Sequence, residues 1–209
     1  MIRKHREAGF TLVEIAIVLV IVGLLLGAVL KGQELIFNSK VKATYNLSRE
    51  MSAAMFAYQD RYKMLPGDDT RATTRFPGAT PATTDGNGDG FLNQVVNWNC
   101  TGVTSGDNCR FLHHLRLSGF IGGAGSDNPI SALGGRVNIA QGNYYVTSAS
   151  TSPSLLFGGS TLTHKAADAI DNGFDDGNPA TGTFRCQNTT SYNMSTPDSL
   201  LSAACILPL

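Results

Sequence analysis

The chain has 209 residues, of which 42% are hydrophobic, and its formal net charge at pH 7 is zero. This length predicts one sizeable domain with an appendage, and the 23 glycines favour a loop-rich domain containing β-structure over a helical bundle. A nucleic-acid-binding surface needs a clustered basic face, so the even charge balance indicates no nucleic-acid partner.

The first segment of the chain is apolar from residue 10 to residue 30, with Glu14 as its one charge. As a helix this segment would be roughly 32 Å long at about 1.5 Å per residue, which is enough to cross a bilayer core of about 30 Å. Basic residues at 3–6 precede it. The positive-inside rule therefore predicts a cytoplasmic N-terminus and export of the remainder.

A signal peptide and a plain membrane anchor each fail to account for one feature of this segment. A secretory signal peptide has an apolar stretch of about 7–15 residues, and residues 10–30 are longer than that. A plain membrane anchor has the right length but leaves Glu14 unexplained, unless the carboxylate lies in water near the interface. An acidic residue at the centre of a membrane helix costs about 2.5–3.5 kcal/mol.

The residues around Glu14 suggest a third explanation. A short charged leader (residues 1–9) ends in Gly9, and the sequence "FTLVE" opens the apolar segment. This arrangement resembles the leader of type IV pilins and type II secretion pseudopilins. The resemblance implies that a prepilin peptidase cuts between Gly9 and Phe10 and N-methylates the new Phe10 amine. It also implies an inner-membrane assembly platform and other pilin-like subunits as partners, besides membrane lipid.

Glu14 acquires a role in this setting. Cleavage creates a positive amine at Phe10, and a carboxylate in a water-poor bundle of apolar helices needs a cationic partner. We therefore expect Glu14 to contact the Phe10 amine of a neighbouring subunit in a pilus or pseudopilus. The alternative is a single-pass anchored domain that is exported, binds a ligand such as calcium, and does not polymerise.

The helix is predicted to continue beyond the membrane, because residues 31–65 contain no proline and only one glycine. An apolar stripe with spacings of three and four follows one helical face: Ala43, Leu47, Met51, Ala54, Tyr58, Tyr62 and Leu65. One helix should run from residue 10 to about residue 63. Residues 10–30 would lie in the membrane or filament core, and the amphipathic half (31–65) would pack on a globular domain (66–209). Pro66 ends the helix.

The globular domain is predicted to be mixed. Its expected elements are a loop region at 66–109, a helix at 107–120 capped by Asp107 or Asn108 and ended by Gly119, a β-hairpin at 135–150 turning at 141–143, a strand at 154–159, a helix at 163–173 and a strand at 182–188. The fold class is therefore α+β: a long N-terminal helix packed on a small antiparallel β-sheet domain with extra short helices and loops.

All four cysteines follow the apolar segment, and an even number in an exported domain predicts disulfides. Of the three pairings that four cysteines allow, we favour Cys100–Cys109 and Cys186–Cys205, because each closes a short local loop. Free buried thiols are the alternative. A zinc site is less favoured because the chain has no CxxC spacing.

One loop has the composition of a calcium site. In "DGNGDGFLN" (85–93), Asp85, Asn87 and Asp89 alternate and Gly90 follows, as in the first half of an EF-hand loop. The Phe91 carbonyl and the Asn93 side chain could extend the ligand set. Val96 stands where an EF-hand has its glutamate, so another carboxylate would have to complete the shell, from among Asp68, Asp69, Asp175 and Asp176. The alternative is a turn-rich linker whose side chains cap their own backbone.

No other cofactor is required by any pattern, and no enzyme is expected, since GxSxG, HExxH and P-loop motifs are missing from the sequence. His113 and His114 are interpreted as packing or surface residues rather than ligands. A second acidic cluster at 171–177 ("DNGFDDG") is predicted to clamp its own loop by turn chemistry.

Overall fold

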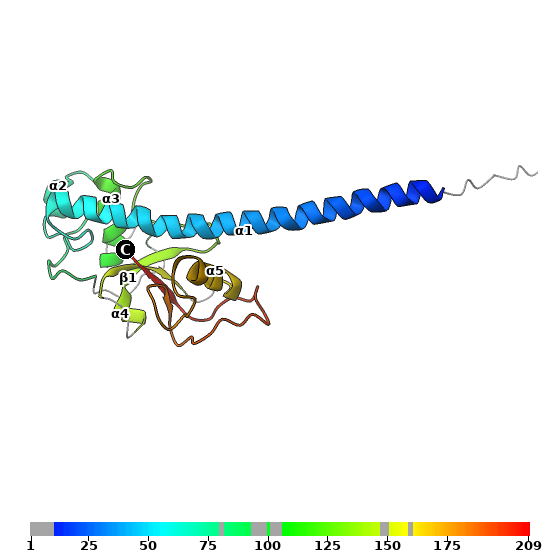
Figure 1. Cartoon of the computed structure of the whole chain (residues 1–209). Helices are drawn as coiled ribbons and strands as arrows, with labels where there is room; N and C mark the ends of the chain where they lie inside the picture. Colours follow the sequence, from blue (N-terminus) through cyan, green and yellow to red (C-terminus); the bar gives the residue numbers. More distant parts are fainter. Residues whose placement is uncertain (1–10, 80–81, 93–99, 101–105, 147–150, 159–160) are drawn as a thin grey trace, which may run out of the picture. The chain divides into compact units, whose positions relative to one another are not determined.

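A computed structural model describes residues 11–79, 82–92, 100, 106–146, 151–158 and 161–209 (Figure 1). The chain forms two compact units, Met1–Ser39 and Lys40–Leu209; we call the second the globular unit. The helices are α1 (Leu12–Tyr62), α2 (Ala72–Arg75), α3 (Asp107–Leu117), α4 (Gly142–Tyr145) and α5 (His164–Phe174), and the strands are β1 (Val137–Gln141), β2 (Pro153–Phe157), β3 (Arg185–Cys186) and β4 (Cys205–Pro208). The predicted α+β class is confirmed.

Helix α1 has 51 residues, so the single long helix predicted from residue 10 to about residue 63 is confirmed over Leu12–Tyr62. It ends where Lys63 adopts a positive φ of 56° and donates its N–H to the Gln59 carbonyl at 2.8 Å. Pro66 follows and cannot extend the helical hydrogen bonding.

The buried face of α1 in the globular unit differs from the predicted stripe. Ala43 is exposed, and Leu47, Tyr62 and Leu65 are only half-buried. The buried residues are Val41, Thr44, Ser48, Met51, Ala54, Met55 and Tyr58. Two of them carry aliphatic hydroxyls with distant partners: Thr44 Oγ1 bonds Ser131 Oγ at 3.0 Å, and Ser48 Oγ donates to the Pro208 carbonyl at 3.1 Å. An apolar stripe search cannot find buried positions whose polar groups are satisfied by distant residues.

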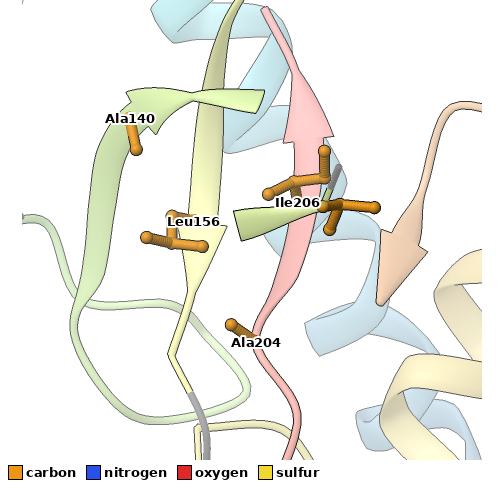
Figure 2. Packing of buried hydrophobic residues seen from close by; sticks show 5 residues of the cluster. Ala140, Leu156, Ala204 and Ile206 are labelled. Atoms are coloured by element: carbon orange, nitrogen blue, oxygen red, sulfur yellow. The ribbon is translucent and has the colours of Figure 1, made fainter. Parts of the chain in front are cut away.

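The sheet has the order β1-β2-β4-β3, and every pairing in it is antiparallel. Residue Ile139 lies opposite Leu155, which in turn lies opposite Leu207. All five residues of β1 are buried, so both of its faces are covered. One residue from each of three strands packs with two residues outside the strands into a cluster made of Ala140, Val146, Leu156, Ala204 and Ile206 (Figure 2).

The predicted hairpin within 135–150 is wrong. Gly142–Tyr145 forms the short helix α4, and β1 pairs instead with β2, with Gln141 opposite Pro153. A strand buried on both faces needs an apolar neighbour, and β2 supplies Leu155, Leu156 and Phe157. Residues 147–150 lie outside the described part of the chain.

The remaining strand predictions and the prediction of helix α3 are confirmed in part. The strand at 154–159 is confirmed as β2, but the one at 182–188 is limited to Arg185–Cys186, and β4 was not predicted. Helix α3 is confirmed, but its N-cap is Gly106 rather than Asp107 or Asn108; Asp107 is the first helical residue, and its carboxylate accepts from Arg110 at 2.7 Å. Its predicted end is right: Gly119 has a φ of 77° and donates to the Arg116 carbonyl.

Helix α5 was predicted at 163–173 and forms at His164–Phe174. Its N-cap is Thr163, whose side-chain oxygen accepts from the Ala166 N–H at 3.2 Å. The Phe174 ring at its other end stacks on the Tyr45 ring of α1, with centroids 3.9 Å apart and planes 3° from parallel. This stack joins α5 to the part of α1 that belongs to the globular unit.

Candidate functional site

The start of α1 is a reciprocal cap. Thr11 precedes the helix, and Glu14 Oε2 accepts from both the Thr11 N–H and the Thr11 hydroxyl, each at 2.8 Å. The Glu14 N–H in turn donates to Thr11 Oγ1 at 3.3 Å. This is a capping box, whose sequence signature T-x-x-E is present at 11–14. Thr11 is therefore a site residue that the sequence could have revealed and that sequence reasoning missed.

Glu14 thus has a local partner within its own chain. Its carboxylate satisfies the first turn of the helix, where a negative charge is also favoured by the helix dipole. Gly9 and Phe10, the predicted processing residues, lie outside the described residues, so the predicted contact of Glu14 with a Phe10 amine stays a prediction.

Beyond Glu14, the first unit presents an apolar surface. Every side chain from Leu12 to Leu30 is exposed, and Leu12 and Leu24 keep 87% and 71% of their surfaces accessible. By length and composition this helix can cross a membrane. Residues 23–27 read GLLLG, a GxxxG pattern that permits close helix approach, and a Cβ at Gly23 or Gly27 would meet no atom of another part of the described chain within 4 Å.

The four cysteines form the two predicted disulfides, Cys100–Cys109 and Cys186–Cys205. The first ties residue 100 to the start of α3. The second joins β3 to β4 at directly opposite positions of the sheet. Disulfides persist in oxidising compartments, so this pattern is typical of an exported domain.

The predicted calcium loop is held by hydrogen bonds within the protein. The Asp85 carboxylate accepts from the Thr73 N–H at 2.8 Å and from its hydroxyl at 3.0 Å. Asp89 accepts from the Asn87 amide at 2.7 Å and from the Phe91 N–H at 2.9 Å. The Asp89 contacts, two residues away on either side, are the turn chemistry that the alternative interpretation predicts, whereas the Asp85 contacts join the loop to Thr73 of α2.

Asp68 occupies the inner side of this loop. Its two carboxylate oxygens accept the N–H groups of Gly88 and Gly90, at 2.6 and 2.7 Å. Asn93 lies outside the described residues, so calcium binding at 85–93 stays a prediction. A rise in melting temperature with calcium, relative to chelator, that is lost in Asp85→Asn would support it; no shift would favour the turn-rich alternative.

The second acidic cluster brings Asp171, Asp175 and Asp176 together, with one oxygen of each within 4.8 Å of the others. Each carboxylate already has donors. Asp171 accepts from Tyr192 Oη and the Gly177 N–H, Asp175 from two backbone N–H groups, and Asp176 from the Thr181 hydroxyl. Burial raises the pKa of Asp171. The predicted loop-clamping role is confirmed.

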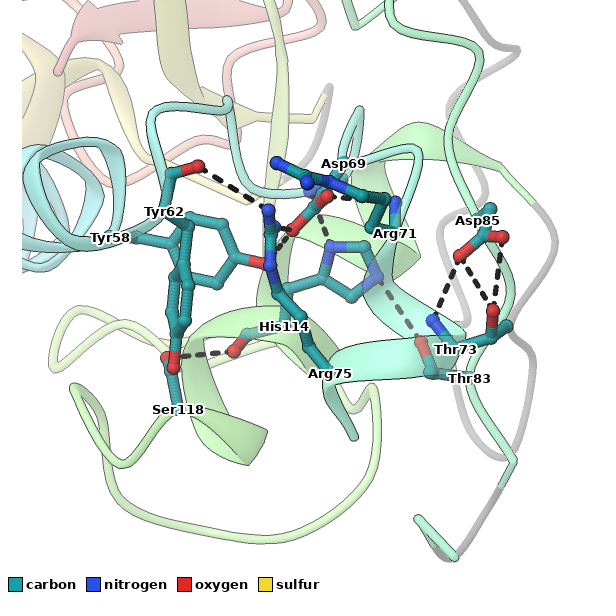
Figure 3. Close-up of polar contacts among 11 residues, drawn as sticks. Tyr58, Tyr62, Asp69, Arg71, Thr73, Arg75, Thr83, Asp85, His114 and Ser118 are labelled. Atoms are coloured by element: carbon teal, nitrogen blue, oxygen red, sulfur yellow. Dashed lines mark hydrogen bonds and ion pairs between the residues drawn. The ribbon is translucent and has the colours of Figure 1, made fainter. Parts of the chain in front are cut away.

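A buried polar network lies where α1 meets the turn that follows it (Figure 3). The Asp69 carboxylate is fully buried and accepts from Tyr58 Oη at 2.7 Å, from the Arg71 N–H at 2.9 Å and from the Arg75 guanidinium, with which it forms an ion pair. Burial first, and Asp69 second, raise the pKa of Tyr58, so the phenol stays protonated as a donor. Asp68 and Asp69 thus both serve the fold through contacts with other residues.

His114 completes the network from α3. Its Nδ1 accepts the Gly67 N–H at 3.0 Å, which places the ring hydrogen on Nε2, 3.2 Å from Thr83 Oγ1. Both His113 and His114 are fully buried, so the interpretation as packing residues rather than surface residues is the one that applies. Neither nitrogen of His113 has a hydrogen-bond partner within the described part of the chain.

Comparison with known proteins gives one finding. Residues 4–30 match the family model of the prokaryotic N-terminal methylation motif. No curated protein and no solved structure matches the chain. The motif describes a structural segment rather than a class of enzyme, and with the apolar helix it fits a membrane-anchored surface protein. The chain therefore carries the prokaryotic N-terminal methylation motif at residues 4–30, and this match supports a type IV pilin-like, prepilin-type protein.

Proposed function

We propose that this chain is a structural subunit that is cleaved after Gly9, N-methylated at Phe10 and assembled through α1 into a type IV pilus or a type II secretion pseudopilus. The observation that carries the proposal is the coincidence of the methylation motif at residues 4–30 with an exposed apolar helix whose one early charge is Glu14. Such a surface needs lipid before assembly and other apolar helices after it.

The proposed pathway follows from the chain's charges and cysteines. The basic N-terminus stays in the cytoplasm, where a prepilin peptidase reaches Gly9, and α1 holds the subunit in the inner membrane. The globular unit folds in the periplasm, where its two disulfides form. The inner-membrane assembly platform then transfers the subunit into the filament beside other pilin-like subunits.

The mass of the mature chain tests the processing step. In cells with an active prepilin peptidase, the intact mass should correspond to a chain that starts at Phe10 and bears one methyl group. A Gly9→Val variant should keep its leader, whereas Ala8→Ser should be processed normally. A mature chain that still starts at Met1 would contradict the proposal and support an anchored domain that does not polymerise.

Assembly should depend on the charge of Glu14 and not only on its capping role. Glu14→Gln preserves the capping box, which accepts glutamine as well as glutamate, but removes the charge. We expect this variant to be inserted and cleaved, yet to enter filaments at least about tenfold less, because the Phe10 amine would be left without a counter-charge. The ratio of sheared-filament protein to membrane protein measures this effect.

Thr11→Val is the matched control for that experiment. It removes the hydroxyl that bonds Glu14 but keeps the carboxylate charge. Filament incorporation should stay near that of the natural chain. If Glu14→Gln assembles normally, or if Thr11→Val fails equally, helix capping rather than charge pairing is the role of Glu14.

A further inference from the structure

The loop at 85–90 contains three consecutive pairs in which an Asp or Asn precedes glycine: Asp85–Gly86, Asn87–Gly88 and Asp89–Gly90. An Asn–Gly bond is prone to cyclise. The Gly88 nitrogen attacks Asn87 Cγ, a C–N bond forms, the Gly88 proton passes to base, and the side-chain nitrogen leaves as ammonia. Water then opens the succinimide at one of its two carbonyls, which yields aspartate or isoaspartate.

The fold requires these glycines, so any Asn or Asp that precedes one of them forms a reactive pair. A Cβ on Gly86 would overlap the backbone of Asp68. Gly88 has a φ of +76°, and a Cβ there would lie 2.6 Å from Thr70 Cγ2. Gly90 has a φ of +83°. Side-chain-bearing residues rarely adopt such φ values.

The backbone nitrogens of the three glycines, which would be the attacking groups, all donate hydrogen bonds to Asp68 or Asp69. The Gly86 N–H donates to the Asp69 carbonyl at 2.9 Å, and the Gly88 and Gly90 N–H groups donate to the two oxygens of Asp68 at 2.6 and 2.7 Å. The Asn87 amide is itself held by Asp89. Before Gly88 can attack Asn87, it must therefore break a hydrogen bond to a charged group that is 2% exposed.

We propose that Asn87 is a site of spontaneous deamidation and that Asp68 suppresses the reaction by holding the Gly88 nitrogen. Asn87 is exposed to water and base, so the hydrogen bond rather than burial provides the protection. Deamidation replaces the amide donor that bonds Asp89 with a carboxylate. The attraction between the two side chains becomes repulsion, and the loop loses a contact once the reaction has occurred.

The first test compares the protein with an unfolded reference. The full chain in detergent and a synthetic peptide of residues 84–92 are incubated in the same mildly alkaline buffer with a chelator. Peptide mapping by mass spectrometry, with separation of aspartate from isoaspartate, measures deamidation at Asn87. We expect the rate in the protein to be at least about tenfold lower than in the peptide, because a hydrogen bond to a charged group is worth about 1.5–3 kcal/mol. Equal rates would overturn the proposal.

The second test removes the clamp. Asp68→Asn removes the negative charge and leaves one acceptor oxygen for the N–H groups of both Gly88 and Gly90, so the hold on the Gly88 nitrogen is weakened. Asn87 should then deamidate about tenfold faster, and the Gly88 amide should exchange faster with deuterium. Asn172–Gly173, exposed in α5, is the internal reference and should keep its rate. An Asn87 rate that is unchanged in the variant, or that rises only in proportion to that of Asn172, would overturn the role of Asp68.

Discussion

We expect Asp69→Ala to lower the free energy of unfolding of the globular unit by about 3–5 kcal/mol, the range for breaking a buried ion pair on one side. The Asp69 carboxylate is fully buried and accepts from Tyr58, Arg71 and Arg75. The Arg75 side chain is 15% exposed, so its charge cannot be rehydrated without rearrangement. Removing the carboxylate leaves a buried phenol and a largely buried guanidinium without their acceptor.

Thermal or urea unfolding of the detergent-solubilised full chain, followed by near-ultraviolet circular dichroism, measures this loss. Asp60→Ala is the matched control, because Asp60 near the end of α1 pairs with Lys63, the first residue after this helix, and both side chains are more than three-quarters exposed. That control should leave stability unchanged within error. A double-mutant cycle of Tyr58→Phe with Asp69→Asn then isolates the phenol–carboxylate bond. Equal stability of the Asp69 and Asp60 variants would refute the structural role of the network.

The globular unit should also lose stability as the pH falls from about 6.5 to about 4. Burial is the main cause that lowers the pKa of His114 to about 4, and the nearby Asp69 only partly opposes it. Arg110 and His113 also disfavour a charge on this ring. The ring must be neutral to accept the Gly67 N–H at Nδ1. The unfolded chain, with a histidine pKa near 6.5, therefore binds more protons than the folded chain in this interval. The free energy of unfolding decreases as the pH is lowered.

The expected loss attributable to His114 is about 3 kcal/mol over the whole interval, at about 1.36 kcal/mol per unit of pKa difference. His114→Asn removes the titration while offering an oxygen to the Gly67 N–H. The variant should show a flatter dependence of melting temperature on pH between 6.5 and 4. His113, whose pKa is also lowered by burial, accounts for a remaining slope of the same sign. A slope as steep as that of the natural chain would show that His114 is not the titrating group.

Predictions that rested on neighbouring residues in the sequence succeeded most often. The length of α1 follows from an uninterrupted run without proline, and the helix predicted at 163–173 forms as α5, with Thr163 as its N-cap. The two disulfides join cysteines separated by 9 and 19 positions, so short loops were enough to choose the pairing. The capping box of Thr11 and Glu14 belongs to the same local class and could have been found from its spacing.

Predictions that depended on distant partners failed or could not be made. The hairpin at 135–150 was wrong because β1 gains more from the apolar β2 than from the residues next to it. Strand β4 was missed because four residues carry too little pattern, and its place beside β2 is set across the chain. The burial of Thr44 and Ser48 depends on hydrogen bonds from their hydroxyls to Ser131 Oγ and to the Pro208 carbonyl, which lie far away in the sequence.

The sequence by itself therefore determined the prepilin-type N-terminus, the long helix and the disulfide pairs, because leader, helix and short loops are encoded by residues close together in the chain. Only the tertiary structure decided the uses of the acidic residues. By residue type alone, Asp68 and Asp69 are equally suitable calcium ligands. In the fold, Asp68 accepts from the Gly88 N–H, and Asp69 accepts from Tyr58 and Arg75. A carboxylate's role depends on which donors the fold brings within hydrogen-bonding distance, and those donors come from segments that the sequence does not place together.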